Sequence, residues 1–408
     1  MSNNRRSAIV GLVFLVIAVV LVFALDAGAQ SKFKTLYKFK GGKDGVLPIA
    51  GLVFDQAGNL YGTVAYGGAR NCGSVYELSP RTDGGWTKKV LHDFTCRPDG
   101  HDPVANLIFD QAGNLYGTTI IGGQHGTGTV FELSKNSDGS WTEKRLHNFI
   151  GRHGGFGLYA GLIFDGAGNL YGTTRGGGDH DDGVVFKLTP KADGSWKETV
   201  LHAFTGVDGE ASQAGIVFDG AGNLYGTTVY GGADGDGTVF KLTPNSSGGW
   251  RETVLHSFTF GKDGAQPYGD LIFDQAGNLY GTAVYGGAYG WGVVFELTPN
   301  ADGSWTETVL HTFTNGTDGS HPLDKLIFDA DGNLYGTAET GGVSGIGVVF
   351  KLAPNSTGEW KETVLHAFTD KPGAEPAAGL IFDAAGNLYG ADPGDNEKTF
   401  GSVFEITP

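Results

Sequence analysis

The chain has 408 residues, of which 71 are glycine, one is methionine and 12% are aromatic. This composition is typical of many short strands joined by tight turns, and it excludes collagen, a bundle of long helices and a disordered chain. The formal net charge of −16 disfavours binding to nucleic acid or to anionic lipid headgroups.

The first 29 residues predict an export signal. Arg5 and Arg6 precede an apolar run of 18 residues from Ala8 to Leu25, and residues 27–29 offer the small side chains that signal peptidase recognises. Because a run of this length also suffices to span a bilayer, an uncleaved membrane anchor is the alternative. Both interpretations make the rest of the chain secreted, periplasmic or displayed at the cell surface, with membrane contact only through this segment.

One motif, Phe-Asp-x-x-Gly-Asn-Leu-Tyr-Gly, occurs seven times at intervals of 54 or 55 residues. Its copies begin at Phe54, Phe109, Phe164, Phe218, Phe273, Phe328 and Phe382. Repeats of about this length that contain several short strands indicate the blades of a propeller, because one small sheet cannot bury both of its faces alone. No linker interrupts the repeat, so we expect a single domain over residues 30–408.

Each copy predicts four antiparallel strands. In the third copy these are residues 162–165, 169–174, 183–189 and 196–204, separated by glycine-rich turns. The fourth strand occurs only six times, but residues 33–39 resemble it and precede the first copy. The sequence therefore predicts an all-β, seven-bladed propeller whose last blade is closed by the N-terminal strand, which leaves no exposed sheet edge.

The consensus Gly-Val-Val-Phe-Lys-Leu-Thr-Pro, Val-Leu-His-x-Phe-Thr-Gly and Phe-Asp-x-x-Gly-Asn-Leu-Tyr-Gly-Thr-Thr resembles the GloVer-type tandem-repeat proteins, extracellular bacterial chains of the choice-of-anchor kind. The resemblance covers residues 33–408. It implies a location in the envelope or outside the cell, and it implies no particular reaction.

Residues present in every blade are expected to serve the fold. The Asp of the repeated motif suits a carboxylate that caps the following turn; a calcium site is the alternative, but the alternating oxygen ligands of a calcium loop are missing. The His of the fourth strand, as in His202, suits an inter-blade hydrogen bond more than a catalytic base. The six Trp that open the fourth strands are expected to pack between blades.

Binding is expected where the copies differ, in the loops on one rim of the ring. Blades 3 to 5 place an arginine and several aromatic side chains there, which suit a glycan or a protein ligand. These residues are Arg175, Tyr230, Tyr268, Tyr285, Tyr289 and Trp291. Plain loop packing is the alternative for Tyr230 and Tyr285, which align with Tyr66.

One rim loop is a metal candidate. Asp179, His180, Asp181 and Asp182 supply oxygen and nitrogen ligands for a divalent cation, although adjacent acids are also common as solvated loop charge. Beyond this possible cation the sequence predicts no cofactor.

The two cysteines predict a disulfide. Cys72 begins a third strand and Cys96 follows the adjoining fourth strand, so antiparallel pairing brings them side by side. Outside the cytoplasm such a pair is expected to oxidise.

Two functions remain open. The first is a non-catalytic binding or scaffold module of the cell envelope, because no nucleophile with a base and no cofactor loop is evident. The alternative is an extracellular hydrolase or lyase that uses rim acids such as Asp179, Asp182, Asp234 and Asp236. Paired acids that converge on the central channel would favour chemistry, and an aromatic patch would favour binding.

Overall fold

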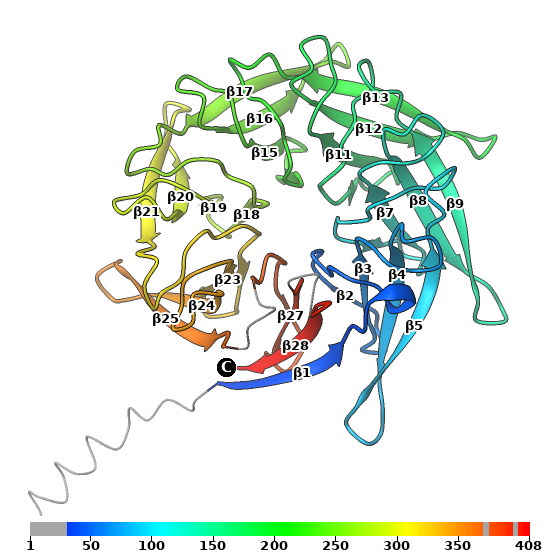
Figure 1. Ribbon diagram of the computed structural model, residues 1–408. Coiled ribbons are helices and arrows are strands. Elements are labelled where there is room, and N and C mark those ends of the chain that lie inside the picture. Colours follow the sequence, from blue (N-terminus) through cyan, green and yellow to red (C-terminus); the bar gives the residue numbers. More distant parts are fainter. Residues whose placement is uncertain (1–30, 370–374, 395–398) are drawn as a thin grey trace, which may run out of the picture.

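Seven four-stranded antiparallel sheets form a closed ring, and in each sheet the successive strands lie side by side at increasing distance from the centre (Figure 1). The structure, a computed structural model, describes residues 31–369, 375–394 and 399–408. The predicted seven-bladed propeller is confirmed. Within the described residues no helix is long and apolar enough to cross a membrane. The predicted export signal or anchor, residues 1–29, lies outside them.

Within a blade the innermost strand has two residues and the outermost has seven or eight, and the chain enters each blade at its centre. Blades 1 to 3 are β2 (Val53–Phe54), β3 (Leu60–Val64), β4 (Ser74–Pro80), β5 (Trp86–Asp93); β6 (Ile108–Phe109), β7 (Leu115–Thr119), β8 (Thr129–Lys135), β9 (Trp141–Asn148); and β10 (Ile163–Phe164), β11 (Leu170–Thr174), β12 (Val184–Pro190), β13 (Trp196–Ala203). Blades 4 to 6 are β14 (Val217–Phe218), β15 (Leu224–Thr228), β16 (Thr238–Pro244), β17 (Trp250–Ser257); β18 (Ile272–Phe273), β19 (Leu279–Ala283), β20 (Val293–Pro299), β21 (Trp305–Thr312); and β22 (Ile327–Phe328), β23 (Leu334–Ala338), β24 (Val348–Pro354), β25 (Trp360–Ala367). Blade 7 is β26 (Ile381–Phe382), β27 (Leu388–Asp392), β28 (Ser402–Thr407) and β1 (Lys32–Lys38), and one 3-10 turn, η1 (Gly42–Asp44), follows β1.

The N-terminal strand closes the ring as predicted. In Figure 1 β1, in blue, runs beside β28, in red, and the two strands pair antiparallel from Lys32 with Thr407 to Lys38 with Ser402. Leu36 and Phe39 are buried at this junction. The outer edge of blade 7 is thus covered by the other end of the same chain.

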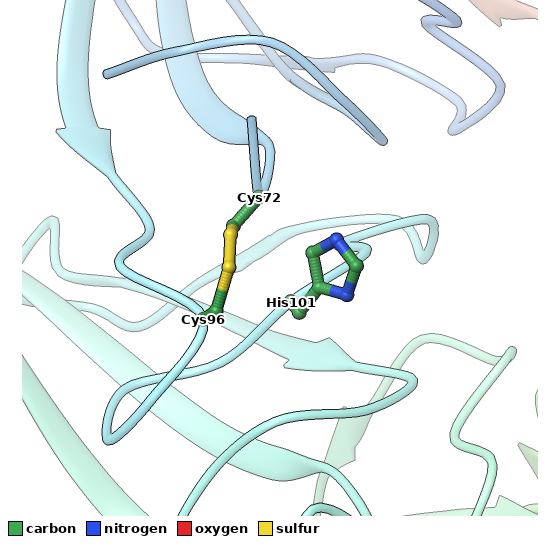
Figure 2. Close-up of side chains that lie close together, drawn as sticks. All are labelled: Cys72, Cys96 and His101. Atoms are coloured by element: carbon green, nitrogen blue, oxygen red, sulfur yellow. A yellow bond between two sulfur atoms is a disulfide. The ribbon is translucent and has the colours of Figure 1, made fainter. Parts of the chain in front are cut away.

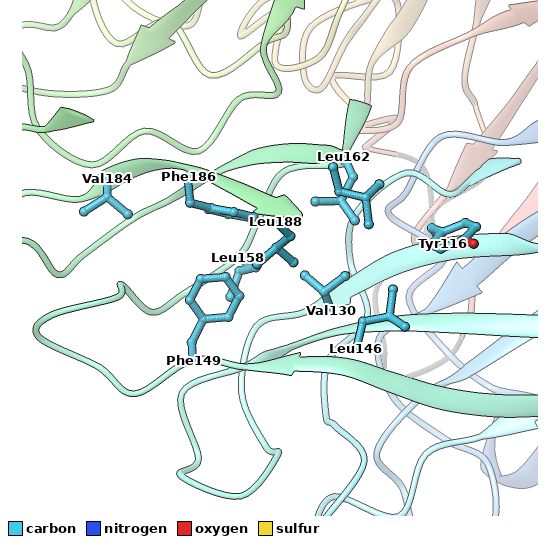
Figure 3. Close-up of a cluster of buried hydrophobic side chains, with 10 residues drawn as sticks. Tyr116, Val130, Leu146, Phe149, Leu158, Leu162, Val184, Phe186 and Leu188 are labelled. Atoms are coloured by element: carbon cyan, nitrogen blue, oxygen red, sulfur yellow. The ribbon is translucent and has the colours of Figure 1, made fainter. Parts of the chain in front are cut away.

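The core lies between blades rather than within them. Figure 3 shows one of its clusters, where Tyr116 and Phe149 of blade 2 pack against Leu162, Phe186 and Leu188 of blade 3. Every blade contributes to two such clusters, one on each face. This explains the repeat: one sheet with two apolar faces is stable only when it is stacked on copies of itself.

The repeated Asp caps its turn, as predicted. Oδ1 of Asp219 accepts hydrogen bonds from the backbone N–H groups of Ala221 and Asn223, and Oδ2 accepts from the Asn223 side chain and the Tyr225 hydroxyl. Burial acts to raise the pKa of this carboxyl, but these donors outweigh it and hold the pKa below its usual value. The same arrangement occurs at all seven copies.

The recurrent histidines pair mostly with an acid of their own blade. Nε2 of His202 lies 2.9 Å from Oδ2 of Asp208, in the loop after the same strand. The same pairing recurs at His92, His256 and His311. An inter-blade bond exists at His147, whose Nε2 lies 2.9 Å from Oε2 of Glu198. The predicted inter-blade bond is therefore wrong for four of the histidines, because the loop that follows their strand supplies a nearer acid.

A glutamate of the next blade completes each of these groups. Burial, together with the charge of Asp208, raises the pKa of Glu252 to about 7. Glu307 and Glu362 also have a pKa of about 7, from burial and from the corresponding aspartates. Burial lowers the pKa of His202, so the group holds its proton on the glutamate rather than on the imidazole near neutral pH. These clusters join neighbouring blades and recur around the ring, which marks them as part of the scaffold.

Candidate functional site

The rim loops are positioned by an inter-blade backbone bridge. The N–H of His321 donates to the carbonyl of Trp291 in blade 5, and the carbonyl of His321 accepts from the N–H of Glu339 in blade 6. His321 adopts a left-handed backbone, with φ of 55°, that lets one residue face both loops. The equivalent bridge joins blades 4 and 5 through Gln266. The rim side chains therefore stand on a fixed backbone, although they come from loops.

An aromatic patch lies on blade 5. Phe260, Tyr285, Tyr289 and Trp291 form this patch, and their exposed fractions are 52, 37, 63 and 37%. The ring centroid of His321 lies 5.2 Å from that of Tyr285 and 5.4 Å from that of Trp291. Burial lowers the pKa of His321, so it is neutral at physiological pH and supports the two aromatic rings without adding a charge.

Phe260 was missed in the sequence, although a signal was present. It adopts a left-handed backbone, with φ of 56°, at the position where Gly41, Gly151 and Gly206 stand in other blades. A bulky residue in this conformation is strained, and such strain is commonly retained at functional sites.

The other predicted rim residues converge beside this patch. Burial and a hydrogen bond with Tyr230 raise the pKa of Tyr268 well above its usual range, and the phenol of Tyr285 adds to this effect while Arg175 opposes it. These four side chains, from blades 3, 4 and 5, are therefore electrostatic neighbours. Arg175 is the only cation among them.

Tyr268 also lines a cavity of about 280 Å³ at the mouth of the central channel. All seven blades contribute to its wall through the loop that precedes their innermost strand. Aliphatic side chains form one part of the wall, and Tyr159, Gln213 and Tyr268 form another. Tyr268, whose neighbour Tyr285 belongs to the aromatic patch, connects the cavity to the patch.

Three acids also line the cavity. Oδ1 of Asp270 accepts a hydrogen bond of 2.5 Å from the N–H of Gly215, and Oδ2 of Asp324 accepts one of 2.5 Å from the N–H of Gly379. Burial and the neighbouring charge of Asp270 raise the pKa of Asp324 to about 6. Burial, and then the charge of Glu375, raises the pKa of Glu339, the third acid.

These acids were also missed in the sequence. Asp270 stands at a position that is Gly51, Gly161, Gly215 and Gly379 in other blades, and Asp324 replaces an alanine or glycine. Comparing the copies at the start of the innermost strand would have found both. The acids named for the enzymatic alternative, Asp179, Asp182, Asp234 and Asp236, are not among the residues that line this cavity.

The predicted metal loop is exposed. Oδ1 of Asp181 accepts a hydrogen bond from the N–H of Gly177 and so holds its own loop, while Asp179 and His180 face solvent. Burial, and then the charges of its neighbours, raises the pKa of Asp182. No other contact in the described residues tests whether this loop binds a cation, so the metal site stays a prediction.

The two cysteines are joined. Figure 2 shows the disulfide between Cys72 and Cys96, whose Cα atoms lie 5.3 Å apart, with His101 beside it. In the described part of the chain these three residues are also the one group of three ligating side chains with all ligand atoms within 4.8 Å of one another. In the disulfide the sulfurs carry no thiolate, so the pair acts as a staple of the blade 1 rim.

Comparison with known proteins identifies a family of repeat proteins. Residues 20–238, 137–302 and 213–408 each match the model of the Gloeobacter/Verrucomicrobia repeat, while no curated protein matches. Among solved structures, a Dyadobacter fermentans protein of unknown function aligns with 93% of this chain and 100% of its own, at 10% identity and a TM-score of 0.48. A Thermus thermophilus protein described as an oxidoreductase (glucose dehydrogenase) aligns with 82% of this chain and 99% of its own, at 16% identity and a TM-score of 0.43.

The two solved structures are too distant to carry an argument about function. The family match is different, because its three overlapping stretches together span every blade. The chain therefore belongs to the Gloeobacter/Verrucomicrobia repeat family.

Proposed function

We propose that this propeller is a non-catalytic binding module of the cell envelope that recognises a glycan through the aromatic patch and the channel-mouth cavity. The observation that carries the proposal is the group of four exposed aromatic side chains on blade 5 beside that cavity. A repeat propeller of this family fits a binding or scaffold role.

A glycan suits this surface for two reasons. Aromatic faces such as those of Trp291 and Tyr289 stack on the apolar faces of sugar rings. Carboxylates and amides such as Asp270 and Gln213 accept and donate hydrogen bonds to sugar hydroxyls in the cavity. A protein ligand would use the same aromatic side chains as anchors, and it is the alternative outcome of the test.

The envelope location is part of the proposal. It rests on the N-terminal segment, on the net negative charge and on the disulfide of the blade 1 rim. Mass spectrometry of the protein recovered from culture medium, periplasm and membranes tests it. A chain that stays in the cytoplasm with residues 1–29 intact would contradict it.

An extracellular hydrolase or lyase is a second candidate. The specific observation in its favour is the pair Asp270 and Asp324, since burial and the charge of Asp270 raise the pKa of Asp324 to about 6, in the range of a general acid. A pair of carboxyl groups is the usual requirement of glycosidases.

The experiment is a glycan array followed by two matched tryptophan variants. We expect Trp291→Ala to weaken an array ligand several-fold, since aromatic stacking contributes about 0.5 to 1.5 kcal/mol beyond area burial. Trp86→Ala, a packing residue of blade 1, should lower the melting temperature and leave the affinity unchanged. Equal affinity of wild type and Trp291→Ala would place the site elsewhere, and cleaved ligand in the mass spectrum would establish the enzyme.

A further inference from the structure

Three ligating side chains meet at the rim of blade 1. The ligand atoms of Cys72, Cys96 and His101 all lie within 4.8 Å of one another, and Figure 2 shows the imidazole beside the two sulfurs. Thiolate sulfur and imidazole nitrogen are the ligand types by which proteins hold zinc. We propose that reduction of the disulfide turns this group into a zinc site, in which the metal ion joins the same two rim loops that the disulfide joins.

The fold does not require these side chains. The counterparts of His101, which make the same bridge to the loop of the next blade, are Val46, Phe156, Glu210, Ala265 and Ser320. The carbonyl of Cys72 accepts the N–H of Asp102, and the residues that accept the equivalent bond in other blades are Asp182, Asp236, Trp291 and Ile346. A disulfide alone would account for the two cysteines, but it needs no histidine beside it.

The surroundings of His101 suit a metal ligand. Its Nε2 lies 3.3 Å from Oδ1 of Asp102, and this buried oxygen accepts no hydrogen bond from any residue that the structure describes. Histidines that bind zinc are usually oriented by a carboxylate next to the ring, and Asp102 is placed for that role. Cys72 is buried, whereas Cys96 and His101 are half-buried, so a metal ion can reach the three ligands from solvent.

The spacing of the group is close to that of a tetrahedral site. Bonds of about 2.3 Å from zinc to sulfur and about 2.0 Å to nitrogen place the ligand atoms roughly 3.5 to 3.8 Å apart. The imidazole is already within 4.8 Å of both sulfurs. The sulfurs must separate by about 2 Å from their bonded positions. Rotation about the Cα–Cβ bonds of the two cysteines supplies this movement and leaves their Cα atoms, 5.3 Å apart, in place.

The disulfide and the zinc site exclude each other, because each uses both sulfurs. A dithiol reductant supplies two electrons and two protons: the S–S bond breaks, Cys72 and Cys96 become thiols, and the dithiol becomes a disulfide. Zinc then binds two thiolates as their protons pass to water, with His101 as the third ligand and water as the fourth. The blade 1 rim is thus joined in both redox states.

The test uses Co²⁺ as a coloured substitute for zinc, at pH 7.5. The full chain is reduced with a phosphine, which becomes the phosphine oxide by taking oxygen from water, and is then freed of reductant under nitrogen. We expect the reduced protein to show a thiolate-to-cobalt charge-transfer band that saturates at one ion per chain and disappears when zinc is added. The oxidised protein should show no such band.

Matched variants assign the ligands. His101→Ala should weaken Co²⁺ binding by about 100-fold, and Asp102→Asn should weaken it by about tenfold. Asparagine tolerates the left-handed backbone of Asp102, with φ of 56°, so this variant keeps the loop. His125→Ala removes an exposed histidine of the blade 2 rim and should change nothing.

A reduced chain with two alkylatable thiols and no charge-transfer band would overturn the inference. Unchanged Co²⁺ affinity in His101→Ala would overturn it as well, because the thiolates would then hold the ion without the imidazole. If reduction alone abolishes the melting transition, zinc is added during the reduction; the transition should return, and its continued absence would contradict the proposal. The site does not include the aromatic patch of blade 5, so none of these outcomes decides the proposed glycan binding.

Discussion

Two kinds of aspartate in this molecule differ in how often they occur and in what surrounds them. The turn-capping carboxylate occurs in all seven blades and accepts several hydrogen bonds, which at Asp219 hold its pKa below the usual value. Asp324, at the channel mouth, occurs once and has a pKa raised to about 6. The fold stabilises the ionised form of Asp219 and disfavours the ionised form of Asp324. Repetition thus separates the acids that every blade uses from an acid that only one blade carries.

The largest expected effect comes from a repeated element. A chain that lacks residues 31–40 loses β1 and the buried side chains of Leu36 and Phe39. We expect its free energy of unfolding to fall by on the order of 5 kcal/mol, since two large apolar side chains leave the core and an edge opens. Thermal denaturation against a chain that begins at residue 31 measures this, and equal stability would contradict ring closure.

The disulfide is a feature of one blade that should nevertheless stabilise the ring. It closes a loop with a sequence separation of 24 residues, so the paired variant Cys72→Ser, Cys96→Ser should lose roughly 3 kcal/mol. Chemical denaturation with and without a reductant measures the effect. If the reductant does not change the stability of the wild-type protein, and mass spectrometry finds free thiols, this prediction is contradicted.

Asparagine substitution at the two kinds of aspartate sharpens the comparison. Asp219→Asn removes an ionised acceptor from buried donors and should cost about 1 kcal/mol. Asp324→Asn mimics the neutral form that the cavity favours and should leave stability unchanged or slightly raised. Urea denaturation at pH 7.5 compares them, and a larger loss at Asp324 would reverse the assignment of roles.

The smallest effect concerns the inter-blade glutamates. Glu252, Glu307 and Glu362 have a pKa of about 7 in the folded protein, above the ordinary value of 4.5. The folded state therefore holds their protons more tightly, so their contribution is present at low pH and is lost as the pH rises through 7.

We expect the melting temperature to fall as the pH rises from about 5 to about 7.5 and to level off above that, with a cost of about 1 kcal/mol per glutamate after solvent screening. Burial lowers the pKa of the neighbouring histidines from the ordinary value of 6.5, which adds a slope of the opposite sign below that pH. Replacing the three glutamates with glutamine should flatten the profile. A triple variant that keeps the same slope would show that other groups cause it.

The fold could be predicted because its evidence is local and repeated. Three features are visible along the chain: the seven copies of the motif, the capping aspartates, and the resemblance of residues 33–39 to a fourth strand. The His202 pairing was predicted incorrectly because several acids lie within its reach and only distance decides among them. Four of the predicted rim residues lie together in the structure, around Tyr268.

The cavity acids could not be placed from the sequence by the same reasoning. Asp270, Asp324 and Glu339 come from three different loops, and their approach depends on the diameter and twist of the closed ring. A change from glycine to aspartate at one position shows that blade 5 differs, but it does not show which other side chains face it. The charge of the cavity is therefore a property of the assembled blades.

The central claim is that ligand binds where the blades differ, and tryptophan fluorine NMR tests it most directly. The chain has seven tryptophans, and Trp291 is the one outside the repeated packing position. In protein labelled with 5-fluorotryptophan, titration with an array ligand should move the Trp291 resonance, assigned with Trp291→Ala, and leave the other six in place. A shift at Trp86 or another packing tryptophan, with Trp291 unchanged, would show that the ligand binds the repeated wall of the ring and would contradict the account.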